Sequence, residues 1–463
     1  MRLFCFVIVS LSLAGCGAAR PNADTACAQI HAPAQAGLVQ CYPARGGRIE
    51  QVLEDAQGTA LAGVARESID FGGGHVVQGP YLARVDPQGH PRFTMRLDSG
   101  LDVKRMPFGT SPDGSLLAAG VSINRKLVPL LRIDARGKPG GFDLAAVLAA
   151  AHEDAANAAD GTRERQQGSL EGVRAALVRK QGEYNHTQTE TVGAELVELQ
   201  EQRKGLEQAI AELDTIIATE PHAPAGVRLL ASGTSGVALL VEQDSVGTLL
   251  LRLSPTLEVQ WLVRPRFEEG ASAMAMDGAG NTYFHYARRL RGIGADGQLL
   301  FDVSEDSWKL PDGAQFYFNR DRVLLGTQHG LTIAGLASVD AGCRYKTDTR
   351  SAAFYPDATG TRGPATCMDR SYGPNDWQMQ AYASAGSGDL IVADISPEEQ
   401  GRVCRGAPGN SVRCAIIERL GGRLHPAHVG LAADGAVVVW GYALGERDAA
   451  DQRTYLFQAR MRL

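Results

Sequence analysis

The feature that most constrains the fold is a short β unit that recurs along the chain. Its first copy has strands at Thr59–Val64, Tyr81–Val85 and Arg92–Leu97, with tight turns at Asp55-Ala-Gln-Gly58 and Asp86-Pro-Gln-Gly89. Asp bonds back to its own backbone and Gly accepts a positive φ, so Asp-x-x-Gly is typical of a tight turn. One such antiparallel meander leaves an apolar face and two open edges. Copies of the unit must therefore pack on one another.

The same pattern returns at a spacing of roughly 40–50 residues once insertions are removed, which is the period of propeller blades. The second copy has the turn Ser111-Pro-Asp-Gly114 and strands at Ser115–Val121 and Pro129–Ile133. The main later strands are Leu229–Leu240, Thr248–Leu253, Ser272–Met276, Thr282–Tyr286, Leu331–Val339, Asp389–Ile395, Cys414–Leu420, Gly430–Gly441 and Thr454–Leu463. We predict a mainly β fold, a β-propeller of about seven blades, because closure into a ring removes the exposed edges.

Between Phe142 and Pro221 the hydrophobic period changes from 2 to about 3.6. One apolar stripe consists of Val192, Leu196, Leu199, Leu206, Ile210, Leu213 and Ile217, and a second of Leu170, Val173, Leu177 and Tyr184. This spacing predicts an inserted α-helical coiled-coil hairpin over residues 143–220, with a break at Asp160-Gly161 and a tip at Asn185-His186-Thr187. Two uses remain open: a stripe satisfied within the hairpin or against the ring, or an arm that docks a protein.

The N-terminus has the pattern of an export signal. Met1-Arg2 is basic, Leu3–Leu13 is apolar and too short to span a bilayer, and Leu13-Ala14-Gly15-Cys16 follows. These four residues resemble the lipobox of bacterial lipoproteins. The resemblance implies a signal peptide at 1–15, lipidation of Cys16 and a membrane anchor at the cell envelope, with Gly17 favouring the outer membrane. The alternative is an ordinary cleaved signal in which Cys16 is incidental.

The remaining segments complete the predicted domain organisation. Residues 16–47 form a lipid-anchored linker, and residues 48–142 and 221–463 form the two parts of the propeller. Six cysteines remain after the signal and Cys16 are set aside: Cys27, Cys41, Cys343, Cys367, Cys404 and Cys414. Six thiols in an exported chain indicate disulfides, with 15 connectivities. We favour pairing between sequence neighbours, 27–41, 343–367 and 404–414.

The first unit also resembles a known class of repeats. Thr59-Ala-Leu-Ala-Gly-Val-Ala65, Ile69-Asp-Phe-Gly-Gly-Gly74 and Tyr81-Leu-Ala-Arg-Val-Asp-Pro-Gln-Gly89 are similar to the SBBP-type propeller repeats of secreted bacterial lipoproteins. The resemblance is good over this unit and poor in the fifth. It implies a β-propeller on the cell envelope and supplies no catalytic residues, because the shared positions are turn and packing positions.

Motifs of known chemistry are scarce. His425-Pro-Ala-His428 offers two nitrogens without an evident third metal ligand, and Asp277-Gly-Ala-Gly-Asn281 lacks the acids of a calcium loop. We therefore predict no catalytic residues, no metal and no cofactor. The net charge of −6 argues against nucleic acid as a partner.

The sequence thus predicts a non-catalytic binding or scaffolding module at the cell envelope. It would meet a protein partner through the propeller face or the helical hairpin, as in the propeller lipoprotein of the outer-membrane barrel-assembly machinery, which it resembles in architecture. The alternative is a propeller enzyme of the quinoprotein or lactonase kind, with a site in the central funnel.

Overall fold

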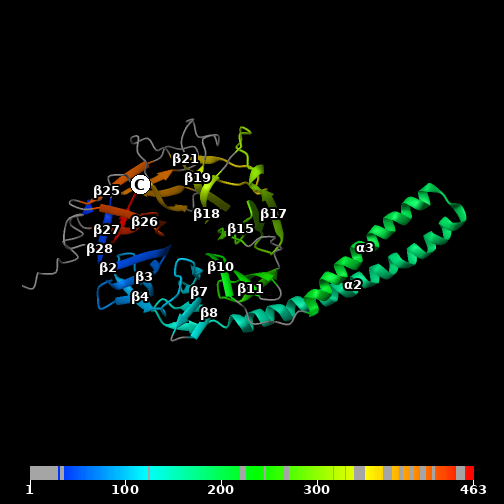
Figure 1. The fold of residues 1–463 in the computed structure, drawn as a ribbon, viewed down its shortest axis with the longest axis horizontal. Coiled ribbons are helices and arrows are strands. Elements are labelled where there is room, and N and C mark those ends of the chain that lie inside the picture. The colour runs from blue at the N-terminus through cyan, green and yellow to red at the C-terminus, as the bar shows by residue number, and fades with distance from the viewer. Residues whose placement is uncertain are drawn as a thin grey trace, which may run out of the picture.

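The computed structural model shows a mainly β protein with an inserted helical hairpin (Figure 1). It describes residues 30–31, 36–123, 126–218, 226–243, 247–263, 271–315, 318–328, 330–337, 350–368, 378–384, 389–395, 401–406, 413–419, 423–444 and 454–463. In the parts of the chain so described, no helix is long and apolar enough to cross a membrane.

The described elements, in chain order, are as follows. The strands before the helices are β1 (Ile30–His31), β2 (Ala36–Asp55), β3 (Gly58–Asp70), β4 (Val76–Val85), β5 (Pro91–Arg96), β6 (Phe108–Thr110), β7 (Leu116–Ile123), β8 (Lys126–Ile133) and β9 (Pro139–Gly141). The helices α2 (Leu144–Thr187) and α3 (Glu190–Ala218) come next. The strands up to the short 3₁₀ helix are β10 (Gly226–Gly233), β11 (Gly236–Gln243), β12 (Gly247–Leu253), β13 (Val259–Val263), β14 (Ala273–Met276), β15 (Thr282–Tyr286), β16 (Arg289–Ile293) and β17 (Leu299–Ser304), followed by η1 (Glu305–Ser307). The last strands are β18 (Phe318–Thr327), β19 (Gly330–Ala337), β20 (Arg350–Phe354), β21 (Ala365–Met368), β22 (Gln378–Ser384), β23 (Leu390–Ile395), β24 (Gly401–Gly406), β25 (Arg413–Arg419), β26 (Arg423–Leu431), β27 (Val437–Leu444) and β28 (Thr454–Met461).

The strands form antiparallel sheets whose basic unit is four consecutive strands. Four sheets have this form: β6–β9, β10–β13, β14–β17 and β18–β21. The next sheet, β22–β25, gains β1 as a fifth strand at its outer edge. The strands predicted at Thr59–Val64, Tyr81–Val85 and Arg92–Leu97 are found within or next to β3, β4 and β5.

The remaining sheet has seven strands in the order β26-β27-β28-β2-β3-β4-β5. It consists of two four-stranded units that share β2, because β2 changes partner along its length. Cys41 pairs with Phe457 of β28, whereas Val52 pairs with Leu61 of β3. The change takes place at Ala44, which is in register with both neighbouring strands. One strand therefore joins the last unit to the first.

The units lie around a common centre (Figure 1). The first strand of each unit contacts the first strands of both neighbours, and these contacts run from β2 through β6, β10, β14, β18, β22 and β26 back to β2. The cycle is closed, so the arrangement is propeller-like. Two sheets packed face to face would instead leave end units without a neighbour on one side.

Apolar cores fill the spaces between adjacent units. One cluster of buried side chains lies at each of the seven junctions between units in the described part of the chain. Strand β3 shows how the sequence achieves this. Ala60 and Ala62 contribute to the core facing the second unit, whereas Leu61 and Ala65 contribute to the core facing the last unit. Because successive side chains of a strand point to opposite faces, both sets must be apolar.

The Asp-x-x-Gly turns form as predicted from the sequence. In the turn after β4, the N–H of Gly89 donates to the carbonyl of Asp86 at 2.8 Å, and the Asp86 carboxylate accepts from the N–H groups of Gln88 and His90. Gly58 closes the corresponding turn after β2 with φ +119°, and a Cβ there would lie 2.1 Å from the carbonyl oxygen of Val85. Glycine is therefore required at Gly58 for both conformation and space.

Arginines on the third strand tie neighbouring units together through these turns. The buried guanidinium of Arg84 pairs with Asp55 in its own unit and donates to the carbonyl of Gly114 in the second unit at 2.6 Å. Arg405 repeats the arrangement with Asp389 at 2.8 Å and the carbonyl of Gly435 at 3.4 Å. Arg84 and Arg405 thus each act as a clamp between two units.

Some features differ from the sequence-based expectation. Residues 36–47 of the predicted linker 16–47 lie in β2 and pair with β28 and β3, because the edges of the last and first units need a partner. The first strand of the opening unit, the second half of β2, was missed because its apolar residues alternate irregularly. Helix α2 continues through the predicted break at Asp160-Gly161, and the hairpin turns at Gln188.

We predict that Arg84→Met lowers the free energy of unfolding by roughly 3 kcal/mol. The substitution leaves the Asp55 carboxylate without its buried cation and the Gly114 carbonyl without its donor. Urea denaturation measures the change. Arg132→Met is the matched control, because Arg132 is 41% exposed and pairs with Asp113 in its own unit; a loss of less than about 1 kcal/mol is expected there. Equal losses in the two variants would contradict the clamp.

The junction between the first and last units contains a carboxyl group with an unusual environment. Glu54, at the end of β2, accepts a hydrogen bond from Thr59 Oγ1 at 2.7 Å. On the other side it lies so close to β26 that a Cβ on Gly430 would be 2.4 Å from Glu54 Cγ. Burial at this junction raises the pKa of Glu54 from 4.5 to about 7.

We predict that Glu54→Gln removes part of the pH dependence of stability. Because the folded protein favours the neutral carboxyl group, Glu54 makes the free energy of unfolding fall as pH rises from about 4.5 to about 7. The glutamine is neutral throughout. The variant should gain stability over the wild type across this range, with a constant difference above it, as measured by urea denaturation at several pH values. A difference that does not vary between pH 4.5 and 7 would contradict the assignment.

Candidate functional site

The helical hairpin is the most prominent feature outside the ring (Figure 1). Helix α2 follows β9, the last strand of the second unit, and α3 leads to β10, the first strand of the third. The carboxylate of Asp143 caps α2 by accepting from the N–H of Ala146 at 3.0 Å. Leu144 and Leu148 are buried in the core between the second and third units. The first turns of α2 are therefore anchored in the ring.

The rest of α2 pairs with α3 and leaves the ring as an arm, residues 159–218. An α-helix rises 1.5 Å per residue, so the 29 residues of α3 extend about 43 Å. At the tip, Gln188 adopts the left-handed conformation, and its N–H bonds to the carbonyl of Tyr184 at 2.8 Å. Helix α2 has 44 residues, and the excess over α3 is the anchored base.

The predicted apolar stripes of the arm meet each other. Leu170 and Val173 of α2 are buried, as are Val192 and Leu196 of α3. Ion pairs flank the seam between the helices: Arg163 with Asp214 at 2.5 Å, Arg174 with Glu207 at 3.1 Å, and Lys180 with Glu195 at 2.6 Å. Of the two uses that the sequence left open for the stripes, the structure therefore supports a seam satisfied within the hairpin.

The outer surface of the arm is acidic along α3. The acidic residues of this helix are Glu190, Glu195, Glu198, Glu201, Glu207, Glu212 and Asp214, and its basic residues are Arg203 and Lys204. Glu190, Glu198 and Glu201 are exposed. Two valines are also exposed on the arm, Val178 by 75% and Val197 by 60%. A partner of the arm would meet carboxylates with scattered apolar side chains.

The topology determines from which end of the ring the arm leaves. Strands alternate in direction, so the turns between first and second strands share one end of the ring with the turns between third and fourth strands. The Asp-x-x-Gly turns occupy this end. The connections between second and third strands, and those between successive units, lie at the other. The arm is a connection between units, so it leaves from that second end, which we call the arm end.

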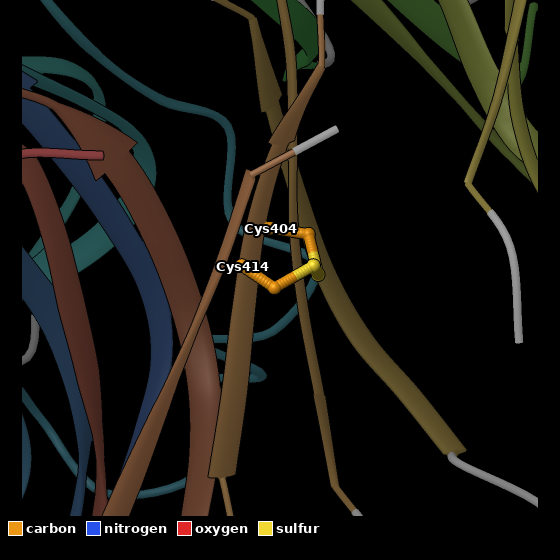
Figure 2. The surroundings of a disulfide bond; sticks show 2 residues. All are labelled: Cys404 and Cys414. Atoms are coloured by element: carbon orange, nitrogen blue, oxygen red, sulfur yellow. A yellow bond between two sulfur atoms is a disulfide. The ribbon is translucent and has the colours of Figure 1, made fainter. Parts of the chain in front are cut away.

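The cysteines predicted from the sequence fall in different parts of the chain. Cys404 and Cys414 form the expected disulfide, which joins directly opposed positions of β24 and β25 (Figure 2). Cys41 is also disulfide-bonded. Cys16, Cys27 and Cys343 lie outside the described residues, and the side chain of Cys367 does as well. The pairings 27–41 and 343–367 therefore stay predictions, as does lipidation of Cys16.

His428 and Asp277, which were considered as metal ligands in the sequence analysis, make contacts with neighbouring strands and turns. His428 on β26 is partly buried, its removal from water lowers its pKa, and its Nε2 lies 3.3 Å from the carbonyl oxygen of Ile49 on β2. Asp277 forms a turn in which its carboxylate bonds to Asn281 and to the hydroxyl of Tyr283. Within the described residues, no group of three or more His, Cys, Asp and Glu side chains is arranged to hold a metal ion.

Comparison with known proteins gives a similarity of fold only. No protein-family model and no curated protein sequence matches this chain. A streptogramin B lyase structure matches with 10% identity and a TM-score of 0.39, over 91% of this chain and 97% of that chain. Virginiamycin B lyase from Staphylococcus aureus matches with 8% identity and a TM-score of 0.33, over 77% and 94%. BamB from Moraxella catarrhalis matches with 11% identity and a TM-score of 0.32, over 90% and 96%.

These TM-scores are low, and the propeller-like fold rests on the strand pairing and the closed cycle of units.

One group of polar residues at the arm end was missed in the sequence analysis. Ser272, His285 and Glu305 are hydrogen-bonded to one another, although 13 and 20 residues separate the successive partners. Such separations match no short motif, and only the register of β14 with β15 and the position of η1 bring these residues together.

We predict that replacing residues 160–217 with a short Gly/Ser linker leaves the ring folded with an unchanged free energy of unfolding. The seam of the arm is satisfied internally, and Leu144 and Leu148 remain in place. Urea denaturation followed by tryptophan fluorescence measures this, because residues 160–217 contain no tryptophan and Trp261, Trp308 and Trp440 lie in the cores of the ring.

Leu148→Ala serves as the contrasting variant, because it empties part of the core between the second and third units. It should cost about 2–4 kcal/mol. Destabilisation of the truncated protein by a similar amount would show that the arm supports the ring, and would overturn its description as an insertion.

Proposed function

We propose that this chain is a seven-bladed β-propeller, tied to the outer membrane by lipid at Cys16, that binds a protein partner at its arm end. The blades are the seven units described above, including the two that share β2. The SBBP-like repeats and the lipobox-like Leu13-Ala14-Gly15-Cys16 support the envelope location. The coiled-coil arm gives the module its reach.

The observation that carries this proposal is the construction of the arm. It projects from a closed ring, its apolar seam is satisfied internally, and its base is fixed in a core. A rigid projection of about 43 Å that adds little to the ring core is best explained by contact with another molecule. The acidic surface of α3 favours a partner with a basic patch, because complementary charge guides association.

The arm end of the ring provides a second part of the binding surface. The connections between second and third strands and those between units gather there, and loops carried on a rigid scaffold are the usual carriers of binding residues. The opposite end carries the tight Asp-x-x-Gly turns, and arginines there hold neighbouring units together through turn carbonyls, as Arg84 and Arg405 illustrate. The two ends therefore have different roles.

Crosslinking in the native envelope tests this function. A photo-crosslinking residue at Glu198 or Val197 on the arm should capture one envelope protein, whereas the same residue at Gln88, in a turn at the opposite end, should not. Replacing Glu190, Glu198 and Glu201 with Gln should weaken the capture at least fivefold and make it less sensitive to salt. Equal capture from both ends would contradict a partner at the arm end.

A separate measurement tests the anchor. Cys16→Ser should release the protein from the membrane fraction, because lipid chains hold it there. Retention of the Cys16→Ser variant in that fraction would contradict anchoring by lipid while leaving the role of the arm intact.

A further inference from the structure

A serine, a histidine and a glutamate meet at the arm end of the fourth unit. Ser272 directly precedes β14, the innermost strand of this unit, so it lies where the connection from the third unit enters the ring. His285 is on β15, near its link to β16, and Glu305 is the first residue of η1, after β17. All three positions belong to the end of the ring that carries connections between units.

The three side chains form a chain of hydrogen bonds. Ser272 Oγ lies 3.0 Å from His285 Nδ1, and His285 Nε2 lies 2.5 Å from Glu305 Oε1. Exposure increases along this chain: the side chain of Glu305 is 7% exposed, that of His285 is 14% exposed, and Ser272 is open to solvent. The carboxylate is thus inside, the imidazole lies between, and the hydroxyl is accessible.

The order of these contacts fixes the histidine tautomer. A carboxylate accepts hydrogen bonds, so the Glu305 contact places a proton on Nε2 of His285. In the neutral imidazole, Nδ1 then has a lone pair directed at the Ser272 hydroxyl. The hydroxyl has a second acceptor in reach, the carbonyl oxygen of His285 at 3.1 Å. The serine proton therefore lies between a backbone carbonyl and a base.

A constrained turn holds the glutamate in place. Ala287 and Arg288, which link β15 to β16, have φ values of 42° and 60°, and this left-handed region costs a residue other than glycine roughly 1–2 kcal/mol. The N–H of Glu305 donates to the carbonyl of Arg288 at 3.0 Å, and Arg288 Nη2 lies 3.0 Å from Asp306 Oδ1. The turn thus fixes the start of η1 and, with it, the carboxylate of Glu305.

We propose that Ser272 is a nucleophile, that His285 is its general base and that Glu305 is a positioning residue, together forming a site that hydrolyses carboxylic esters. Such a site requires a nucleophile, a base and a carboxylate that orients the base, and these roles hold whichever imidazole nitrogen faces the serine. The assignment goes beyond the binding function and depends on neither the arm nor the lipid anchor.

The reaction balances with water as the only co-reactant. Ser272 Oγ bonds to the ester carbonyl carbon while its proton passes to His285 Nδ1, and this proton then joins the departing alkoxide as the ester C–O bond breaks. A water molecule next gives a proton to Nδ1 and its oxygen to the acyl carbon. The acyl–serine bond breaks, Ser272 recovers the proton, and a carboxylic acid leaves. Throughout, the Glu305 carboxylate stabilises the imidazolium through Nε2–H.

A fluorophosphonate probe, which phosphonylates activated serines, tests the site in the full-length protein. We expect labelling of the wild-type protein, with peptide mass spectrometry locating the adduct on Ser272, and none there in Ser272→Ala. His285→Gln should slow labelling at least a hundredfold, since it removes the base. The control serine is Ser169 on the arm, whose hydroxyl bonds to the carbonyl of Arg165 at 3.2 Å but contacts no histidine in the described structure. Ser169→Ala should label as the wild type does.

Glu305 requires a readout that a purely structural role would not change. Glu305→Gln should reduce the rate of bond formation at saturating probe at least tenfold, leave the probe concentration for half-saturation unchanged and leave the melting temperature of the ring unchanged. Glu305→Asp should recover part of that rate. The proposal is overturned if the folded wild-type protein carries no adduct on Ser272, or if labelling of Ser272 persists at the same rate in His285→Gln.

Discussion

The closure of the ring depends on one strand. Strand β2 hydrogen-bonds to β28 along its first half and to β3 along its second, so that the last and first units become a single seven-stranded sheet. Without this strand the last unit would expose the edge of β28, and the first would lack its innermost strand. Backbone groups at such an edge are unsatisfied, and they attract other chains. The junction between the last and first units is filled because β2 lies in one sheet with β26, β27 and β28.

Closure also explains how the molecule can carry an arm. Each unit is covered by neighbours on both faces, and each junction has its own apolar cluster, so the connections between units are free to vary in length. The connection between β9 and β10 has grown into two helices whose own seam is buried, with only the first turns of α2 in the core of the ring. The two ends of the ring also differ in what their connections carry. At one end Arg84 and Arg405 reach turn carbonyls of the next unit, whereas the arm and the Ser272–His285–Glu305 grouping occupy the other end.

Several of these features could be predicted from the sequence, because they depend on interactions between residues that are close together in the chain. The turn at Asp86-Pro-Gln-Gly89 is encoded by a side chain that bonds its own backbone and by a glycine with positive φ. The seam of the arm follows from the spacing of Val192 and Leu196. The disulfide between Cys404 and Cys414 joins neighbours in sequence across one hairpin. The candidate site was less accessible: the acidic surface of α3 is evident in the sequence, but the position of the arm at one end of the ring follows only from strand order.

The sequence by itself determined the repeating unit, its turns, the inserted hairpin and the pairing of Cys404 with Cys414, because each depends on residues close together in the chain. Tertiary structure alone decided how the ring closes, since the pairing of Cys41 with Phe457 joins segments from opposite ends of the polypeptide. It also decided that Arg84 reaches Gly114 of the next unit, and that Ser272, His285 and Glu305 meet. These contacts arise from strand register and from the packing of one unit on the next, which are long-range properties that no local pattern of residues encodes.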